Sequence, residues 1–314
     1  MKRIFSVAPM MDYTDRHFRF LARLLSPNAW LYTEMIHANA IIHGDTTRFL
    51  AHHPSEYPLA IPLGGCEPKK LAAAAKIAEE HGFNEINLNI GCPSDRVQKG
   101  RFGACLMREP ELVAECVATI KSQVKLPVTV KTRLGVDNDD SLAFLVNFLE
   151  IVTSAGCQTF ILHARKAWLK GLNPKQNRSI PPLNYQRVYD IKKRFPELEI
   201  IINGGIETIE AVNNHLQQID GVMLGRKAYH QPFLLRTIES VCFATPPISL
   251  SQVFEKIYIY MQTEITKGTP MQHISRHISG LFLGQANASH WRRNLAIDPL
   301  KTLHFAINSP KTFV

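Results

Sequence analysis

One cysteine stands in a setting that favours acid–base chemistry. Cys92 lies between Gly91 and Pro93, just after a segment that carries Asn87 and Asn89. A cysteine thiol is mostly protonated at neutral pH, so it can donate a proton to a substrate. Cysteine is also a common small core residue, but the polar, glycine-containing neighbourhood favours an exposed loop here. We therefore predict that Cys92 is a catalytic acid.

Two further residues are suited to an anionic ligand. Lys131 ends the apolar run 128–130, and His163 ends the run 159–162. A lysine at such a place either extends its stem to solvent or faces an anion. A histidine at such a place is often only a core residue whose ring nitrogens are hydrogen-bonded within the protein. Both residues are candidates for contact with a negatively charged ring.

Glycines follow two other apolar runs. Asn203-Gly204-Gly205 comes after residues 200–202, and Gly225-Arg226 comes after residues 221–224. Glycine lets the backbone approach an anion closely, and a guanidinium pairs well with phosphate. Gly-Gly also marks ordinary turns. We predict a phosphate site here. With Lys131 and His163, it suggests a phosphorylated cofactor whose ring becomes anionic during turnover, such as FMN.

All of these residues follow candidate β-strands. Strand patterns occupy residues 4–8, 30–33, 59–63, 85–89, 128–131, 159–163, 200–203 and 221–224, and helical patterns occupy residues 69–80, 111–123, 142–152, 185–195 and 207–216. Eight strands separated mostly by helices within about 225 residues predict a (β/α)8 TIM barrel. A doubly wound open sheet is the alternative, but no G-x-G-x-x-G follows the first strand. In a barrel the carboxyl ends of the strands form the active site, so this architecture brings the candidate residues to one mouth.

The alternation of strands and helices stops near Thr245-Pro246-Pro247. Residues 251–266 and 272–283 have amphipathic helical patterns, and no further strand–helix unit follows. The segment 246–314 has seven basic residues, Lys311 among them, and three acidic residues, a net charge of +4. We predict a barrel domain over residues 1–245 and a small, positively charged, all-helical domain over residues 246–314.

The composition indicates the class of protein. A chain of 314 residues with 45% hydrophobic and 20% charged residues is typical of globular proteins and excludes collagen-like and wholly disordered chains. No apolar run is long enough to span a membrane, and the first one is too short for a signal peptide, which predicts a cytoplasmic protein. The six cysteines form no C-x-x-C pair and no zinc-spaced cluster. We expect free thiols and no metal site.

The charge distribution favours a polyanionic partner. The formal net charge is +9, and the segment from Arg165 to Arg178 has five basic residues, Trp168 and no acidic residue. A basic loop with an aromatic residue suits RNA phosphates and base stacking, although a charge run can also be a solvated face. Its predicted place at the mouth of the barrel favours RNA.

Together these motifs resemble those of the flavin-dependent tRNA-dihydrouridine synthases. The resemblance covers essentially the whole chain, and the cysteine motif with its flanks is its most specific part. The matching motifs are A-P-M-M-D-Y-T-D-R-H-F-R at 8–19, N-L-N-I-G-C-P-S at 87–94, K-G-R-F-G-A at 99–104, V-K-T-R at 130–133, H-A-R at 163–165, N-G-G-I at 203–206, and R-H, G-L-F and W-R-R at 276–277, 280–282 and 291–293. Residues 33–35 and 177–183 look most like the A branch of the family, which acts at uridines 20 and 20a of tRNA.

The resemblance implies a mechanism and a set of site residues. NADPH reduces bound FMN, the reduced flavin passes a hydride to C6 of a uridine extruded from the tRNA D-loop, and Cys92 protonates C5. The implied cofactor-binding residues are Pro9, Met10, Met11, Lys131, His163, Asn203, Gly204, Gly205, Gly225 and Arg226. The implied tRNA-binding residues are Asn89, which would orient the uracil, Lys175, Arg178 and Arg292. We expect a monomer.

Two positions depart from the family pattern. The family usually has Gln where Pro62 stands, and its A branch often has Arg where Ser289 stands. Pro62 offers neither a side-chain amide nor a backbone N–H. We predict that FMN binds more weakly by about 1 kcal/mol for this lost hydrogen bond, and that one phosphate contact is missing at Ser289.

Two other functions stay open. One is a flavin barrel enzyme that acts on a free pyrimidine and is similar to dihydroorotate dehydrogenase. The other is a non-catalytic tRNA-binding protein that has lost its cofactor, a reading to which Pro62 lends some support. The basic loop and the helical tail speak against the first, and the retained Cys92, Lys131 and His163 speak against the second.

Overall fold

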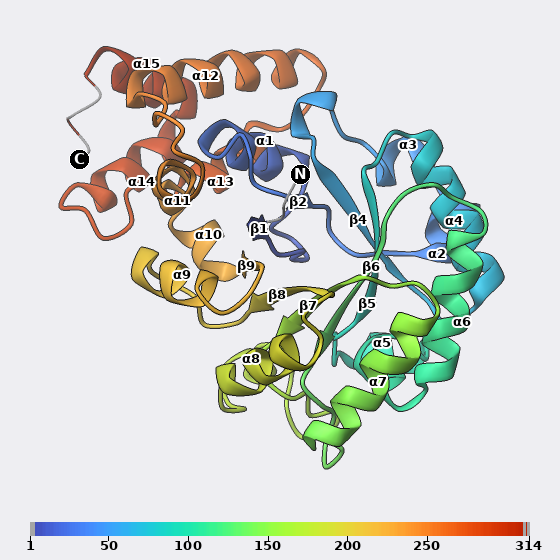
Figure 1. The fold of residues 1–314 in the computed structure, drawn as a ribbon. Helices are drawn as coiled ribbons and strands as arrows, with labels where there is room; N and C mark the ends of the chain where they lie inside the picture. The colour runs from blue at the N-terminus through green and yellow to red at the C-terminus, as the bar shows by residue number, and fades with distance from the viewer. Residues whose placement is uncertain (1–3, 310–311, 313–314) are drawn as a thin grey trace.

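Parallel strands form a closed ring at the centre of the molecule. The computed structural model describes residues 4–309 and residue 312. Within this range, the ring follows the order β1-β9-β8-β7-β6-β5-β4-β2 (Figure 1). Trp30 closes it, because its N–H donates to the Phe5 carbonyl and its carbonyl accepts from Val7 N, both at 3.0 Å. The ring strands are β1 (Phe5–Val7), β2 (Leu31–Tyr32), β4 (Leu59–Gly64), β5 (Glu85–Ile90), β6 (Val128–Arg133), β7 (Thr159–His163), β8 (Glu199–Asn203) and β9 (Gly221–Leu224). The predicted (β/α)8 barrel and its eight predicted strands are confirmed.

Side chains along each strand alternate between the barrel interior and an outer core under the helices. An apolar cluster in the interior consists of Ala8, Tyr32, Ala60, Ile161, Ile201 and Met223. Beside it lie the buried polar side chains of Glu85, Asn87 and Thr129, which hydrogen-bond to one another. The alternate residues, such as Val130, Leu162 and Ile202, belong to the outer core. The residue two positions further along a strand faces the interior again. By this rule Pro62, His163, Asn203 and Gly225 face inward one layer closer to the carboxyl ends of the strands. The carboxyl ends of the strands therefore open onto a largely polar mouth.

The predicted helices surround the ring, with bounds that agree to within two residues. They are α4 (Pro68–Glu80), α6 (Pro110–Lys121), α7 (Leu142–Ser154), α8 (Tyr185–Arg194) and α9 (Ile209–Leu216). Proline starts α4 and α6, where its missing N–H costs nothing because first-turn amides have no helical partner. Thr208 accepts a hydrogen bond from Ala211 N and so caps α9. This cap explains why α9 begins two residues later than predicted.

Several short elements were not predicted. They are α1 (Arg16–Leu25), β3 (Ile36–His37), α2 (Ala38–His43), α3 (Thr46–Phe49), α5 (Asp95–Lys99), α10 (Arg226–His230) and α11 (Phe233–Phe243). Most are too short to show a helical period. β3 continues the line of β2 along β4, but with one extra residue, since Leu31 pairs with Leu59 and Ile36 pairs with Leu63. This bulge bends the second strand at residues 33–35, next to the mouth.

The C-terminal region is a small group of helices. It contains α12 (Leu250–Thr266), α13 (Met271–Ile278), α14 (Ala288–Ile297) and α15 (Pro299–Asn308) around Phe254, Phe282 and Trp291. α12 agrees with the prediction, but α13 ends at Ile278 instead of 283. Gly280, two residues after the end of α13, packs so close to the His230 carbonyl that a Cβ would be 2.6 Å from it. The chain continues from there in turns instead of in a helix. The domain boundary at 245/246 stays a prediction, and Lys311 lies outside the described residues.

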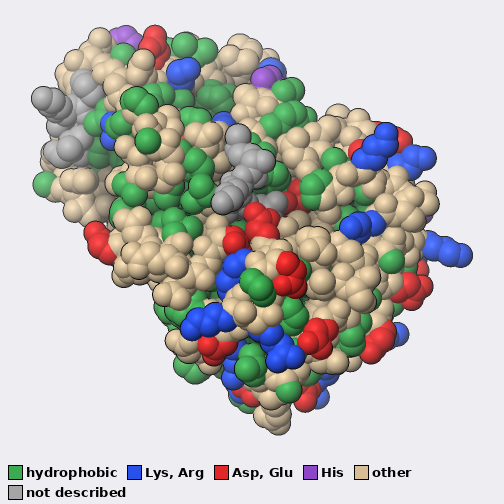
Figure 2. Space-filling model, in the orientation of Figure 1, with side chains coloured by type: hydrophobic (Ala, Val, Ile, Leu, Met, Phe, Trp, Pro, Cys, Tyr) green, Lys and Arg blue, Asp and Glu red, His purple; other side chains and the backbone are tan. Residues whose placement is uncertain are grey.

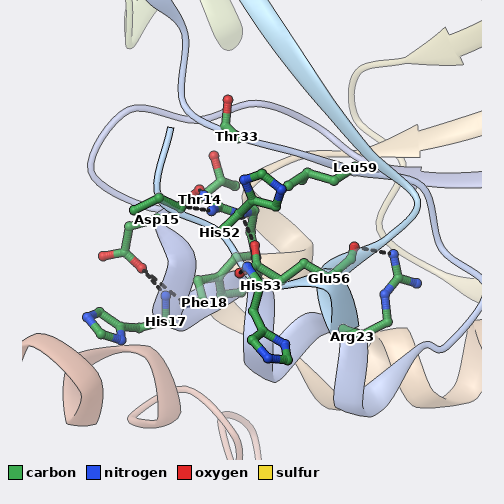
Figure 3. Close-up of polar contacts among 12 residues, drawn as sticks. Thr14, Asp15, His17, Phe18, Arg23, Thr33, His52, His53, Glu56 and Leu59 are labelled. Carbon is green, nitrogen blue, oxygen red and sulfur yellow. Dashed lines mark hydrogen bonds and ion pairs between the residues drawn. The ribbon is translucent and has the colours of Figure 1, made fainter. Parts of the chain in front are cut away.

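Helix α1 joins this helical tail to the barrel. Asp15 caps α1 by accepting hydrogen bonds from His17 N and Phe18 N, both at 3.0 Å (Figure 3). Phe20 stacks on Tyr260 of α12 with ring centroids 3.9 Å apart, and Arg16 forms an ion pair with Glu264. The tail is thus anchored through an element that starts at the mouth. No described helix is long and apolar enough to cross a membrane.

Candidate active site

The loop that carries Cys92 is held by two neighbours. Asn89 Oδ1 accepts hydrogen bonds from Gly91 N at 3.1 Å and Cys92 N at 3.2 Å. Ala104 N donates to the Cys92 carbonyl at 2.9 Å, and Gly103, at φ +79°, leaves no room for a Cβ, which would lie 2.4 Å from that carbonyl. The Cys92 side chain is only partly buried. The structure therefore presents the thiol on a rigid, accessible loop.

Lys131 points into the barrel and shares its mouth with Cys92. Its Nζ donates to Asn203 Oδ1 at 3.1 Å, and Asn203 Nδ2 donates to the Met223 carbonyl at 2.7 Å. Burial, together with the nearby Arg133, lowers the pKa of Lys131 to about 7, and Cys92 lies close enough to oppose this shift. An anionic ligand in the mouth would favour the protonated ammonium.

His163 lies directly against the glycine turn that follows β8. A Cβ on Gly204, whose φ is +111°, would be 2.5 Å from His163 Cδ2. The hydroxyl of Tyr185 donates to the Gly204 carbonyl at 2.8 Å and holds the turn in place. Burial, with Arg133 and Lys131 nearby, lowers the pKa of His163 well below its ordinary value. The imidazole is therefore neutral at physiological pH.

The glycine turns and three arginines fit a bound phosphate. In the described structure, the amides of Gly204, Gly205, Gly225 and Arg226 have no hydrogen-bond acceptor. Arg165, Arg178 and Arg226 lie near one another, and none forms an ion pair with a described acidic side chain. Arg165 Nε is buried without a partner. Free amides, bare glycines and unpaired guanidinium groups are the donor set of an anion site.

The three arginines form a cluster of one sign of charge. On the face drawn in Figure 2, cationic and anionic side chains lie side by side over the barrel. At the mouth, burial and the neighbouring Arg226 lower the pKa values of Arg165 and Arg178, as expected where cations gather. The residues present therefore fit a phosphorylated cofactor such as FMN.

Arg133 is a site residue whose role the sequence did not reveal. Its side chain is 3% exposed and donates to the carbonyls of Gly91, Lys166 and Asn177. It thus ties the cysteine loop to the basic loop. The sequence held one indication of this role: Arg133 follows Lys131 by two residues, so both side chains lie on the same face of β6. Asn177, fully buried, closes the basic loop through the carbonyls of Trp168 and Leu172.

The other predicted residues lie on the loop after β1, on the basic loop and on the tail. Met10 N donates to Thr14 Oγ1 at 3.0 Å, in the loop after β1 that also contains Pro9, and Met11 is 58% exposed beside it. Lys175 and Arg178 are exposed on the basic loop, and Arg178 is near Cys92. Arg292 is exposed on α14 of the tail. Pro62 occupies an inward position of β4, so the predicted effect on FMN binding stays a prediction.

The chain is similar to a known family and to curated proteins over most of its length. A family model described as dihydrouridine synthase matches residues 6–303. Three curated relatives named tRNA-dihydrouridine(20/20a) synthase are similar over most of the chain. The Shewanella oneidensis protein is 53% identical and covers 94% of this chain and 89% of its own, the Xanthomonas axonopodis pv. citri protein is 52% identical with coverage of 93% and 87%, and the Synechocystis protein is 51% identical with coverage of 93% and 88%.

Among solved structures, a complex of 2-naphthoyl-CoA reductase has a similar fold. Its TM-score is 0.56 at 9% identity, and the match covers 78% of this chain and 50% of that one. At this identity the likeness extends to the fold alone.

Proposed function

Because this chain belongs to the dihydrouridine synthase family, we propose that it reduces the C5=C6 bond of uridine 20, uridine 20a or both in the D-loop of tRNA. Membership of the family makes the chain an oxidoreductase. The position of the uridine is taken from the names of relatives that share about half of its residues over more than nine-tenths of its length.

The proposed cofactor is FMN, with NADPH as its reductant. When bound and reduced, FMN supplies the hydride for C6 of the uracil. Lys131, His163 and Asn203 would face its ring, and the loop from Pro9 to Met11 would flank it. Gly204, Gly205, Gly225 and Arg226 would hold its phosphate with their free amides and the guanidinium. The neutral imidazole of His163 adds no further charge to the cationic mouth.

Cys92 is the proposed proton donor. Its S–H bond breaks as a C–H bond forms at C5, and a thiolate remains on the enzyme. Lys131, Arg133 and Arg178 all lie within electrostatic range of the sulfur. The observation that carries the proposal is this pairing of an accessible thiol with an inward lysine at one mouth.

The proposed tRNA contacts surround the mouth. Arg178 and Lys175 would bind phosphates from the barrel side, and Arg292 would do so from the tail. Asn89 holds the cysteine loop through its Oδ1, and we propose that it also orients the uracil. Extruding a base costs a few kcal/mol and least where the base is unpaired, which suits a loop uridine.

A spectrum and a mapping experiment test the proposed function. The purified protein should be yellow from FMN, and after addition of NADPH it should convert uridine 20 or 20a of a D-loop-containing tRNA to dihydrouridine. A colourless protein that binds tRNA would support the non-catalytic function instead. Turnover of free uridine or orotate without RNA would support an enzyme of free pyrimidines.

A further inference from the structure

A groove lies beside the cysteine loop, outside the barrel mouth. It has a volume of about 520 Å³, within the range of about 300–1,000 Å³ typical of small-ligand pockets. One wall is α5, which begins three residues after Cys92, and the other is the segment 169–174 of the basic loop. Its lining residues are Asp95, Gln98, Lys99, Leu169, Lys170, Gly171, Leu172, Asn173 and Pro174.

The groove combines charge with an apolar surface. Lys99 and Lys170 are both exposed, and neither forms an ion pair or hydrogen bond with another described side chain. Leu169, Leu172 and Pro174 are only partly buried along the second wall. Unpaired ammonium groups suit phosphates, and apolar side chains suit contact with a base.

Gln98 connects this groove to the reacting cysteine. Its Nε2 donates to the Pro93 carbonyl at 2.8 Å and to the Leu169 carbonyl at 2.7 Å. Pro93 follows Cys92 directly, and Leu169 begins the second wall. The amide therefore fixes the distance between the groove and the cysteine loop, so a ligand in the groove lies at a defined place relative to the thiol.

We propose that this groove binds a tRNA nucleotide that neighbours the target uridine, with its phosphate near Lys99 and Lys170 and its base against Leu169, Leu172 and Pro174. This inference rests on the proposed function, because it takes the target uridine to lie at the mouth. The nucleotide chemistry could also come from NADPH. We favour RNA because the basic loop forms one wall of the groove, and the exposed Lys175 follows Pro174 directly in that loop.

A double variant tests the groove. Lys99→Ala/Lys170→Ala should raise the Kd for tRNA on the order of tenfold and reduce the slope of log Kd against log salt by about one to two, since two phosphate contacts are lost. FMN absorbance and the rate of FMN reduction by NADPH without RNA should match those of the wild type. Unchanged tRNA affinity and salt slope would overturn the proposal. A raised KM for NADPH with normal tRNA binding would assign the groove to the reductant.

Lys125→Ala/Lys193→Ala is the matched control. Lys125 precedes β6 and Lys193 lies in the last turn of α8, so both are at the opposite end of the barrel. Both are exposed and outside any described ion pair, and their loss removes the same charge. If this control lost as much affinity for tRNA, the effect would come from net charge alone, and the proposal that the groove binds a nucleotide would be overturned.

Ethylation of single D-loop phosphates identifies the bound nucleotide. One ethylated position next to the target should weaken binding to the wild type but not to the double variant. If no position behaves in this way, the groove does not bind a neighbouring phosphate. If the wild type holds no FMN and forms no dihydrouridine, the proposed function fails. The tRNA affinities of the wild type and the double variant still test whether the groove binds a nucleotide.

Discussion

The carboxylate of Asp15 and the imidazole of His277 lie 3.0 Å apart, although 262 residues separate them along the chain. Asp15 caps α1 of the barrel, and His277 is 1% exposed near the end of α13. Burial alone would raise the pKa of Asp15, but hydrogen bonds from His277, Phe18 N and Arg276 hold it well below its ordinary value. One side chain therefore both starts the first barrel helix and anchors the tail.

Asp15→Asn should destabilise the protein by about 1–3 kcal/mol at pH 7, because asparagine still caps the helix but loses the charge-assisted bonds to the tail. The depressed pKa of Asp15 means that its contribution is complete above the unfolded-state pKa of about 4 and is lost as the pH falls further. Urea unfolding of both proteins at pH 7 and pH 3 measures this. The gap should shrink at pH 3, and a constant gap would contradict the assignment.

Asp298→Asn is the control for that measurement. Asp298 caps α15 by accepting a hydrogen bond from Lys301 N, and it forms no hydrogen bond or ion pair with a barrel residue in the described structure. Its substitution should leave stability within about 0.5 kcal/mol of the wild type, since asparagine is an equally good cap.

Cys92→Ala should retain FMN and bind tRNA with wild-type affinity but lose about 10²–10⁴-fold in the rate of dihydrouridine formation. That range is the usual contribution of a general acid. Single-turnover kinetics with pre-reduced enzyme isolates the step. Cys66→Ala provides the comparison, because Cys66 is another partly buried free thiol in a loop after a strand. Near-normal turnover by Cys92→Ala would remove Cys92 from the acid role.

FMN affinity should fall as the pH rises above about 7 in the wild type. The pKa of Lys131 is about 7 in the free protein, and an anion in the mouth binds better to the protonated ammonium. One proton limits the effect to at most about tenfold per pH unit. Fluorescence titrations from pH 7 to 9 measure this. Lys131→Met should bind FMN more weakly and without this pH dependence, and an equal dependence in both proteins would show that another group titrates.

Gly204→Ala should abolish FMN binding and destabilise the protein by about 1–3 kcal/mol, the usual range for a strained backbone position. The new Cβ would meet the His163 ring at 2.5 Å, and φ is +111°. Gly171→Ala separates strain from the clash, because Gly171 also has a positive φ, +82°, but nothing lies within 4 Å of its Cβ. Thermal melts and FMN absorbance compare them, and normal FMN retention by Gly204→Ala would contradict this account of the turn.

The sequence alone was enough to predict the barrel, because alternating apolar residues, proline helix starts and glycine turns are local signals. It also placed Cys92, Lys131, His163 and Asn203 at one mouth, since a closed parallel sheet collects the carboxyl ends of its strands. The sequence pattern did not predict the role of Arg133, which donates hydrogen bonds to carbonyls of two separate loops. It also did not predict the groove beside Gln98.

The tertiary structure alone decided the contact of Asp15 with His277, the bulge between β2 and β3 and the grouping of free amides around the glycine turns. A periodic pattern reports only which face of one element is buried. Hydrogen bonds between distant segments depend on how whole elements pack, and a buried polar group takes whichever partner that packing brings within reach.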